Sequence, residues 1–343
     1  MKKLVDERAF SWILSGAAML LMLSLPLFAP SSITGLVTEI FILALFAMSL
    51  GLIMGYAGLV SLGHAAFFGA GAYTVAILSQ HVSNAYVLLA SATLVAAGLA
   101  AVSGALFFRS AGAYFLMLTL AFAQVLSSAA SQAPSSLTGG SDGLNVTVAL
   151  NLGFGEINSQ TGLYYTMGGA FLIGYVLLRL FVSSPAGMIT RGIMDNELRM
   201  RALGYRTFDY KLFAYTLAGA LAGFAGAMYT YFNLYVTPDF LGWIFSGEAL
   251  IMVIVGGAGT LLGPALGAAF FTILQNYVSF YTDYWALVMG VVFVLFVLLG
   301  RGGIVHIFRS LWGMFFRTGP GGSAEPQNAD DRTIPSARKG EMS

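Results

Sequence analysis

Long apolar segments, separated by short polar stretches, follow one another along most of the chain. Most are about 17–23 residues long, the length that an α-helix needs to cross the hydrocarbon core of a membrane. In chain order, the predicted spans are residues 10–28, 36–53, 58–78, 86–107, 112–131, 162–182, 212–232, 246–255 with an extension to about 262, 264–280 and 285–300. The pattern predicts an all-α polytopic membrane protein of about ten transmembrane helices.

The composition supports this class. Of the 343 residues, 58% are hydrophobic and 9% are charged, whereas about a quarter of the residues in a soluble domain are charged. The chain has no Cys, which excludes disulfides and thiolate metal sites, and its net charge of +1 gives no indication of a nucleic-acid partner. Its 42 Gly residues are typical of bundles in which helix backbones approach closely.

The two ends of the chain lie outside the predicted membrane domain, residues 10–317. The apolar run at 10–28 resembles a signal peptide, but it ends in LPLFAPSS with Leu27 where a cleavage site needs a small residue. We therefore predict an uncleaved first span after a cytoplasmic segment, 1–9. Residues 318–343 are rich in Pro, Gly, Ser and charged residues without an apolar face, which predicts a disordered cytoplasmic tail.

The basic residues fix the predicted orientation in the membrane. With the N-terminus inside and ten alternating spans, all 16 Lys and Arg residues fall on the inner side, as the positive-inside rule requires. The outer loops then hold the acidic residues Asp142, Glu156, Asp239 and Asp283. We expect a multi-pass protein of the cell inner membrane with both termini in the cytoplasm, a large outer loop at 132–160 and a large inner loop at 183–211.

The inner loop at 183–211 contains a predicted short helix, residues 196–203. Asp195 is a suitable N-cap and Gly204 a suitable C-terminal stop. Glu197 and Arg201 have the spacing of an ion pair along a helix. A solvated charged loop without a binding role is the alternative interpretation of this segment.

Glycine clusters mark two further segments, 56–63 and 256–263, which begin two similar sequences, AGLVSLGHAAFF and AGTLLGPALGAAFF. We predict broken or re-entrant backbone there, which is tolerated at membrane depth only when it is buried in protein or lines a cavity. Tight helix packing is the alternative, as for the G-x-x-x-G pair Gly219 and Gly223. The candidates for the translocation path are Gly58, Gly63, Gly139, Gly140, Glu248, Gly256, Gly257 and Gly259.

Few polar side chains lie within or near the spans, and we single out Glu39, His64, Gln124, Glu248, Gln275 and Asn276. An ionisable group in a span is costly and suggests a functional site. Both glutamates lie near the predicted outer edge, where water can also reach them. The sequence has no phosphate-binding loop, no metal-ligand spacing and no hydrolase motif, so we expect neither an enzyme nor a cofactor or metal site.

Four separated motifs resemble the permease subunits of branched-chain amino acid ABC importers of the LivM kind. They are GLIMGYAGLVSLGHAAFFGAGAY, YFLMLTLAFAQ followed by LTGGSDGL, DNELRMRALGYRTFDYKLFAYTLAGALAGFAGAMY, and SGEALIMVIVGGAGTLLGPALGA. The resemblance runs from about residue 50 to residue 303.

The resemblance implies a non-enzymatic permease subunit that imports branched-chain amino acids by alternating access. Its implied partners are a second, LivH-like permease, two cytoplasmic ATPase subunits, a periplasmic substrate-binding protein and the lipid bilayer. The predicted inner helix matches the helix that couples to the ATPase, and its candidate coupling residues are Asp195, Asn196, Glu197, Arg199, Arg201 and Gly204.

Met194 departs from the family pattern, because Arg is usual there. Arg199 and Met200 lie where a more Ala-rich run is expected of ABC importers generally. These departures leave the identity of the ATPase partner open. The alternatives in function are a permease of the same architecture for urea or short amides, and a channel or secondary transporter that needs no ATPase.

Overall fold

The computed structural model describes residues 25–26, 28–110, 112–146, 150–151, 156–157 and 159–299. The segments predicted at 1–9 and 318–343 lie outside the described residues, as does the predicted span 10–28 except for residues 25, 26 and 28. All structural statements below concern the described part of the chain.

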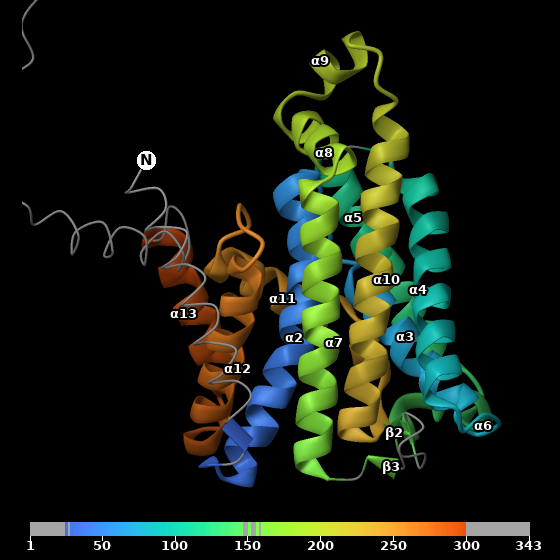
Figure 1. The fold of residues 1–343 in the computed structure, drawn as a ribbon, viewed down its shortest axis with the longest axis vertical. Coiled ribbons are helices and arrows are strands. Elements are labelled where there is room, and N and C mark those ends of the chain that lie inside the picture. The colour runs from blue at the N-terminus through green and yellow to red at the C-terminus, as the bar shows by residue number, and fades with distance from the viewer. Residues whose placement is uncertain are drawn as a thin grey trace, which may run out of the picture. The chain divides into compact units, whose positions relative to one another are not determined.

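The described chain is a bundle of helices (Figure 1). Its longer helices are α2 (Ser31–Tyr56), α3 (Ala65–Leu78), α4 (Ala85–Phe107), α5 (Ala113–Gln132), α7 (Gln160–Ser183), α10 (Thr207–Asn233), α11 (Trp243–Gly256), α12 (Gly263–Tyr281) and α13 (Trp285–Leu299). Shorter ones are α6 (Ser135–Thr138), α8 (Pro185–Asp195), α9 (Glu197–Ala202), η1 (Gly140–Asp142) and η2 (Pro238–Leu241). Each predicted span after the first has a helix at its place. The prediction of an all-α polytopic membrane protein is confirmed, with α2, α4, α5, α7 and α10 each long and apolar enough to cross a membrane.

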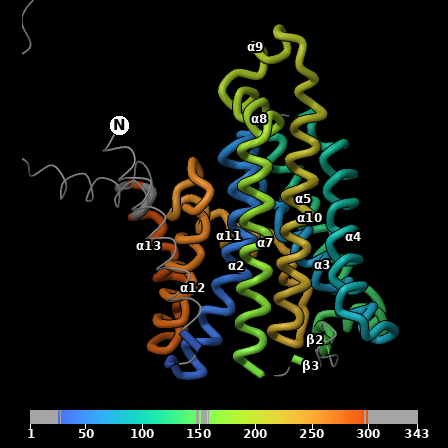
Figure 2. The backbone as a smooth tube through the Cα atoms, viewed as in Figure 1, coloured from blue at the N-terminus to red at the C-terminus, as the bar shows by residue number. Residues whose placement is uncertain are grey.

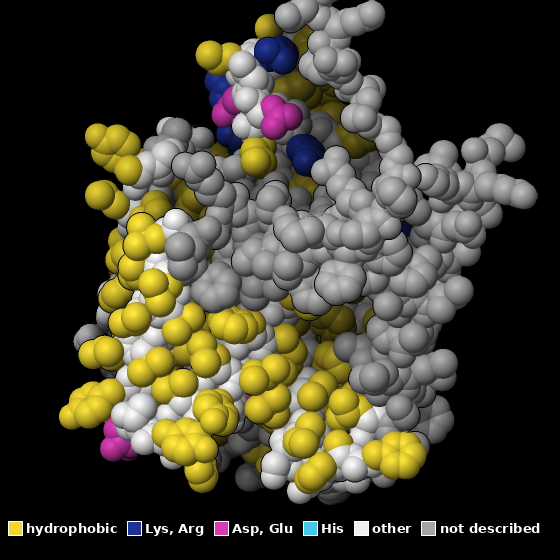
Figure 3. Space-filling view, turned by 90° about the vertical axis from the view of Figure 1, so that its left-hand side faces the viewer, with side chains coloured by type: hydrophobic (Ala, Val, Ile, Leu, Met, Phe, Trp, Pro, Cys, Tyr) yellow, Lys and Arg dark blue, Asp and Glu magenta, His cyan; other side chains and the backbone are white. Residues whose placement is uncertain are grey.

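Charge separates the two ends of the bundle. We call the end with α8 and α9 the α9 end and the opposite end, with the short β-strands, the strand end (Figure 1). The described Lys and Arg residues all belong to the α9 end: Arg109, Arg179, Arg191, Arg199, Arg201, Arg206 and Lys211. On the face in Figure 3, hydrophobic side chains cover much of the described surface below that end. The α9 end therefore corresponds to the predicted inner side.

Two small antiparallel strand pairs, absent from the sequence prediction, organise the strand end. β1 (Leu144–Asn145) pairs with β4 (Tyr235–Val236), with Leu144 opposite Val236. β2 (Leu150–Asn151) pairs with β3 (Glu156–Ile157). The first pair joins the loop after α5 to the loop after α10. Two segments that are distant in sequence therefore pair with each other at this end of the bundle.

The core is built around α2 and α10, whose paths are followed most easily in Figure 2. In α2, 78% of the most apolar window is buried, compared with 22% in α5. α10 packs on α2, α3 and α4. The sequence periodicity is apolar on all sides of these helices, so only packing distinguishes the central helices from those that present a face to lipid.

Glycine brings the backbones of α3, α4 and α10 together. A Cβ at Gly71 of α3 would overlap the carbonyl oxygen of Gly223 in α10, and a Cβ at Gly226 would overlap that of Phe68 in α3. On α4, a Cβ at Gly219 would overlap the methyl group of Ala100, and a Cβ at Gly223 would overlap that of Ala96. The predicted G-x-x-x-G pair is therefore a packing element between helices, which needs small residues because lipid provides little hydrophobic drive for helix association.

Two predicted spans have different bounds from those expected. The span at 58–78 is helical only in α3, and the span at 246–262 is helical only in α11, which starts at Trp243 and ends at Gly256. Each helix has 14 residues, about 21 Å at 1.5 Å per residue, and is too short to cross the membrane alone. The remaining residues, 57–64 and 257–262, are non-helical, as the glycine clusters predicted.

We predict that Gly226→Ala destabilises the protein, because the new methyl group would overlap the carbonyl oxygen of Phe68 and force α3 and α10 apart. Such overpacking costs roughly 1–3 kcal/mol. The measurement is thermal unfolding of the purified protein in detergent, followed by size-exclusion chromatography.

The matched control is Gly98→Ala in α4, where the same methyl group meets open space. It is expected to leave the unfolding temperature unchanged or to raise it, because Ala favours a helix over Gly. Equal melting temperatures for the two variants would contradict the proposed backbone contact.

Candidate functional site

The first candidate site is the α8–α9 hairpin at the α9 end. Ser184 caps the start of α8 by accepting a hydrogen bond from the Gly187 amide at 3.2 Å. Asn196 caps α9, since its Oδ1 accepts a hydrogen bond from the Arg199 amide at 2.9 Å. The prediction of Asp195 as the N-cap is therefore wrong: Asp195 is the last residue of α8, because Asn196 takes the extended conformation that a cap needs.

Gly204 terminates α9, as the sequence predicted. It adopts a left-handed conformation with φ of 89°. Its amide donates to the carbonyl of Arg201 at 2.9 Å, and the Tyr205 amide donates to that of Met200 at 3.1 Å. This pair of bonds satisfies carbonyls that would otherwise lack partners at the end of the helix. A side chain at residue 204 would meet no neighbouring atom, so the constraint on this position is conformational rather than steric.

Glu197 joins α9 to the start of α10. Its Oε1 accepts a hydrogen bond from Arg201 at 2.6 Å and another from the hydroxyl of Thr207 at 3.0 Å. Its Oε2 pairs with the Lys211 ammonium group at 2.5 Å. The predicted Glu197–Arg201 pair is confirmed. The contacts with Thr207 and Lys211 were not predicted, because they depend on the turn between the two helices.

The pKa of Glu197 reflects this environment. Partial burial acts to raise the pKa of the carboxyl group, but the hydrogen bonds from Lys211 and Arg201 outweigh it and lower the pKa below its usual 4.5. Because the pKa is lowered in the folded state, the network stabilises α9 above the usual pKa of glutamate and loses that contribution as the pH falls through the lowered value.

The tip of the hairpin exposes apolar side chains beside charged ones. Leu198 is 77% exposed and Leu203 is 66% exposed. Met194, at the end of α8, and Arg199 are also exposed. Apolar groups flanked by charge, on a segment that projects from the bundle (Figure 1), are typical of a surface that binds another protein.

The second candidate site is the broken backbone at 57–64. The Leu62 amide donates to the hydroxyl of Thr119 in α5 at 3.2 Å, and the Ala65 amide donates to that of Ser246 in α11 at 2.9 Å. Side chains of neighbouring helices thus satisfy backbone groups that a continuous helix would pair internally. His64 precedes α3 and is fully buried, with its Nε2 at 2.8 Å from the Ser49 hydroxyl.

The candidate path residues Gly58 and Gly63 serve this broken segment in different ways. Gly58 has a positive φ of 69° and lies with Leu59 and Val60 against a small cavity of about 160 Å³ at the start of α5. Gly63 packs directly on the backbone of Thr119. Of these two, Gly58 therefore borders this cavity, and Gly63 packs on the neighbouring helix.

The turn at 257–262 packs against the end of α2, directly before the first broken segment. A Cβ at Gly55, near the end of α2, would overlap the carbonyl of Ala258, and Gly51 packs on Pro264. Gly256 packs on Gly263, and Gly257 has a positive φ of 105°. Gly259 faces open space. The structure thus brings the two similar sequences together around the end of α2.

Gly139 and Gly140 lie at the strand end, far along the chain from these turns, and both have positive φ. A Cβ at Gly139 would overlap the carbonyl of Gly143. They shape the tight turns of the loop that leads into β1, and they do not border the cavity described next.

The third candidate site is a cavity of about 640 Å³ near the strand end, into which Glu39 and Glu248 both face. Glu39 comes from α2 and Glu248 from α11. The other lining residues are Leu43, Gln124, Ser127, Tyr229, Asp239, Phe240, Gly242, Trp243, Ile244, Phe245, Gln275 and Trp285. The sequence marks Glu39, Gln124, Glu248 and Gln275 as unusual polar residues of the spans, but it does not indicate that they line one cavity.

The aromatic residues that line this cavity were not predicted, because aromatic residues are frequent throughout the spans.

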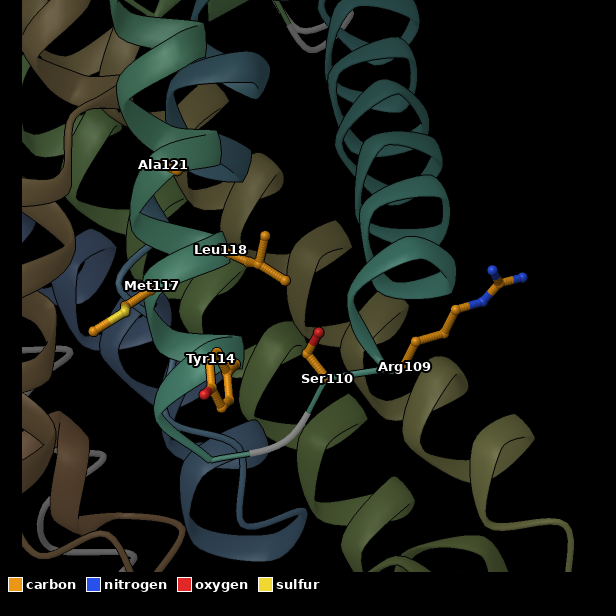
Figure 4. A pocket seen from close by; sticks show the side chains of 6 residues that line it. All are labelled: Arg109, Ser110, Tyr114, Met117, Leu118 and Ala121. Atoms are coloured by element: carbon orange, nitrogen blue, oxygen red, sulfur yellow. The ribbon is translucent and has the colours of Figure 1, made fainter.

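A further, open cavity of about 660 Å³ lies between the end of α4 and the start of α5 (Figure 4). It is lined by Arg109, Ser110, Tyr114, Met117, Leu118 and Ala121. The Arg109 side chain points away from α5 (Figure 4), so this cavity presents few polar groups to a solute.

Comparison with known proteins relates these sites to a family. Residues 32–297 match the profile of the family described as the permease component of branched-chain amino acid transport systems. The chain is 25% identical over 317 residues to the high-affinity branched-chain amino acid transport system permease protein LivM of Escherichia coli, covering 85% of this chain and 74% of that protein. The ribose import permease protein RbsC of Bacillus subtilis is 30% identical over 145 residues, 40% of this chain and 44% of that protein. No solved structure matches the chain.

We predict that Gly204→Val frays α9 whereas Gly204→Asn leaves it largely intact. The reason is that a left-handed conformation costs an ordinary residue about 1–2 kcal/mol but is accessible to Asn. Hydrogen–deuterium exchange of the peptide containing residues 197–205 measures the effect.

Valine is expected to raise the exchange rate several-fold more than asparagine does. Since there is open space around this position, equal protection in the two variants would show that Gly204 is not required for the helix end.

Proposed function

The chain belongs to the permease-component family of branched-chain amino acid transport systems, and we propose on that premise that it imports branched-chain amino acids as one membrane subunit of an ABC importer. Members of this family are transport subunits rather than enzymes, and they work in complexes with other subunits. For this chain we propose a second, LivH-like permease, two ATPase subunits on the α9 side and a binding protein on the strand side, in the cell inner membrane.

The observation that carries the proposal is the link from α9 to the core of the bundle. α9 lies at the protruding end with Leu198, Arg199 and Leu203 exposed. Glu197 ties it to Lys211 in the second turn of α10, and α10 packs on α2, α3 and α4. A displacement of α9 by an ATPase would therefore move α10 and the helices packed on it.

In this mechanism α9 is the coupling helix. Asn196 and Gly204 fix its two ends, Glu197 and Arg201 hold it to α10, and Arg199 with the exposed leucines contacts the ATPase. ATP-driven closure of the ATPase pair then rocks the permease between states open to either side. The energy comes from the partner chains, in agreement with the lack of any phosphate-binding loop in this sequence.

The broken segments supply the second element of the mechanism. Residues 57–64 and 257–262 pack around the end of α2 through Gly55 and Ala258. Their backbone lacks the internal hydrogen bonds of a helix, so they can change conformation at a lower cost than a continuous span. We propose that Gly58, Gly63, Gly256, Gly257 and Gly259 allow this movement, that Gly139 and Gly140 shape the outer entrance, and that Glu248 lines the path.

We predict that Glu197→Lys abolishes ATP-driven leucine uptake while the protein still inserts into the membrane. The new positive charge would face Arg201 and Lys211 and separate α9 from α10. The measurement is uptake of labelled leucine by cells that produce the variant, with membrane content determined by immunoblotting.

Asp209→Lys is the matched control, since Asp209 is an exposed acidic residue in the first turn of α10 that takes no part in the Glu197 network. It is expected to retain at least about half of the wild-type uptake, as surface substitutions usually cost less than about 0.5 kcal/mol. Normal uptake by Glu197→Lys would rule out the coupling role.

We also predict that deletion of the gene lowers the uptake of labelled leucine by the cells and leaves their uptake of urea unchanged. A second expected result is that an ATPase subunit co-purifies with the chain in mild detergent. Urea uptake that falls while leucine uptake is unchanged would favour the short-amide alternative. Solute flux through the purified chain without ATP would favour a channel or a secondary transporter.

A further inference from the structure

We infer that the cavity lined by Glu39 and Glu248 holds the transported solute by its ammonium group. This inference rests on the proposed function, and it specifies the solute as a zwitterionic amino acid with an apolar side chain. It concerns the end of the bundle opposite to the coupling helix, so that the two assignments can be tested separately.

The cavity has the form of a small-molecule site. It is formed by side chains from α2, α5, α10, α11, α12, α13 and the segment around η2, so that most of the bundle converges on it. Its volume of about 640 Å³ lies within the range of about 300–1,000 Å³ that is typical of ligand pockets. A branched-chain amino acid would fit with space for water.

The charge in this cavity is unbalanced within the described part of the chain. Three carboxylates, Glu39, Asp239 and Glu248, line it and no Lys or Arg does. The described basic residues lie at the other end of the bundle, and the ion pairs among described residues both involve Glu197. Carboxylates within a bundle are costly without a partner, and a primary ammonium group supplies both the missing charge and three hydrogen-bond donors.

The remaining polar residues fit the other end of a zwitterion. Gln124 of α5 and Gln275 of α12 also line the cavity, and each carries an amide group. Trp243 adds an indole N–H. These neutral donors can bind the carboxylate of an amino acid. A lysine or arginine in their place would also neutralise the glutamates, which these donors leave charged.

An aromatic wall completes the site. The Tyr229 and Phe240 rings lie 5.2 Å apart, and Phe240 and Phe245 lie 5.6 Å apart. Phe46 and Phe68 pack behind Phe245, with ring centroids at 5.4 and 5.0 Å from it. Phe46 and Phe68 are fully buried, so the wall is backed by packed side chains, and its apolar surface favours a branched aliphatic side chain over a polar one.

The arrangement therefore selects for the ammonium group. A solute that carries a carboxylate but no ammonium group would place negative charge beside three carboxylates. A neutral solute such as urea would leave the carboxylates uncompensated. An amine without a carboxylate would keep the principal interaction.

The test uses the complete transporter, with its partner permease and ATPase subunits and the binding protein, reconstituted in liposomes. Glu39→Gln and Glu248→Gln are each expected to lower ATP-driven leucine uptake about tenfold or more, since hydrogen bonds to charged groups contribute roughly 1.5–3 kcal/mol. Glu248→Asp should retain more uptake than Glu248→Gln. ATPase stimulation by the loaded binding protein should persist in all of them, because α9 is unchanged.

The matched control is Asp283→Asn, an exposed carboxylate between α12 and α13 that does not line the cavity. It should transport leucine at the wild-type rate. Folding of each variant is checked by size-exclusion chromatography before reconstitution.

A second readout needs no variant and remains decisive where a variant fails to fold. Labelled leucine is bound to the purified wild-type complex without the binding protein, and unlabelled competitors are added. Leucinol, which keeps the ammonium group, should compete, and 4-methylpentanoate, which lacks it, should not.

The outcomes separate the two proposals. If the wild-type transporter shows no ATP-dependent leucine uptake, the proposed function fails. If it imports leucine but both Gln variants transport at wild-type rates, or if 4-methylpentanoate competes as well as leucinol does, the ammonium site is overturned and the import function stands.

Discussion

Close contact between helix backbones is the constraint on which the rest of this structure depends. In a membrane, apolar side chains gain little by leaving lipid for another helix, so that association depends on the closeness of packing. Gly71, Gly223 and Gly226 allow α3 and α10 to meet at the level of their carbonyl groups. Ala96 and Ala100 give α4 the same access to α10. The result is a closely packed unit of three helices.

This unit connects the two ends of the protein. At the α9 end, Glu197 holds α9 to α10 through Lys211. At the strand end, α10 leads into β4, which pairs with β1, and Tyr229 of α10 lines the cavity of the two glutamates. One helix therefore reaches from the proposed ATPase contact to the proposed solute site. A rigid connection of this kind is a physical route by which a movement at one end reaches the other.

The broken segments give the bundle a region with fewer internal constraints. Residues 57–64 depend on the hydroxyl groups of Thr119 and Ser246 for hydrogen bonds that a helix would form by itself. These hydroxyls belong to α5 and α11, both of which line the cavity of the two glutamates. The stability of the break is thus linked to the positions of the helices around the proposed solute site. A shift of those helices would alter the hydrogen bonds that hold the break.

The sequence alone determined the class of protein, the order of its spans, the charged α9 end and the places where helices break, because apolar length, basic residues and glycine act locally along the chain. It also predicted the ion pair between Glu197 and Arg201, which lie four residues apart on one helix. Only the tertiary structure decided that Asn196 rather than Asp195 caps α9, that Lys211 completes the network, and that Glu39 and Glu248, on helices distant in sequence, share a cavity with Gln124 and Tyr229. Those relations depend on how helices that are apolar on every side rotate and pack against one another, and the spacing of residues along the chain carries no record of that rotation.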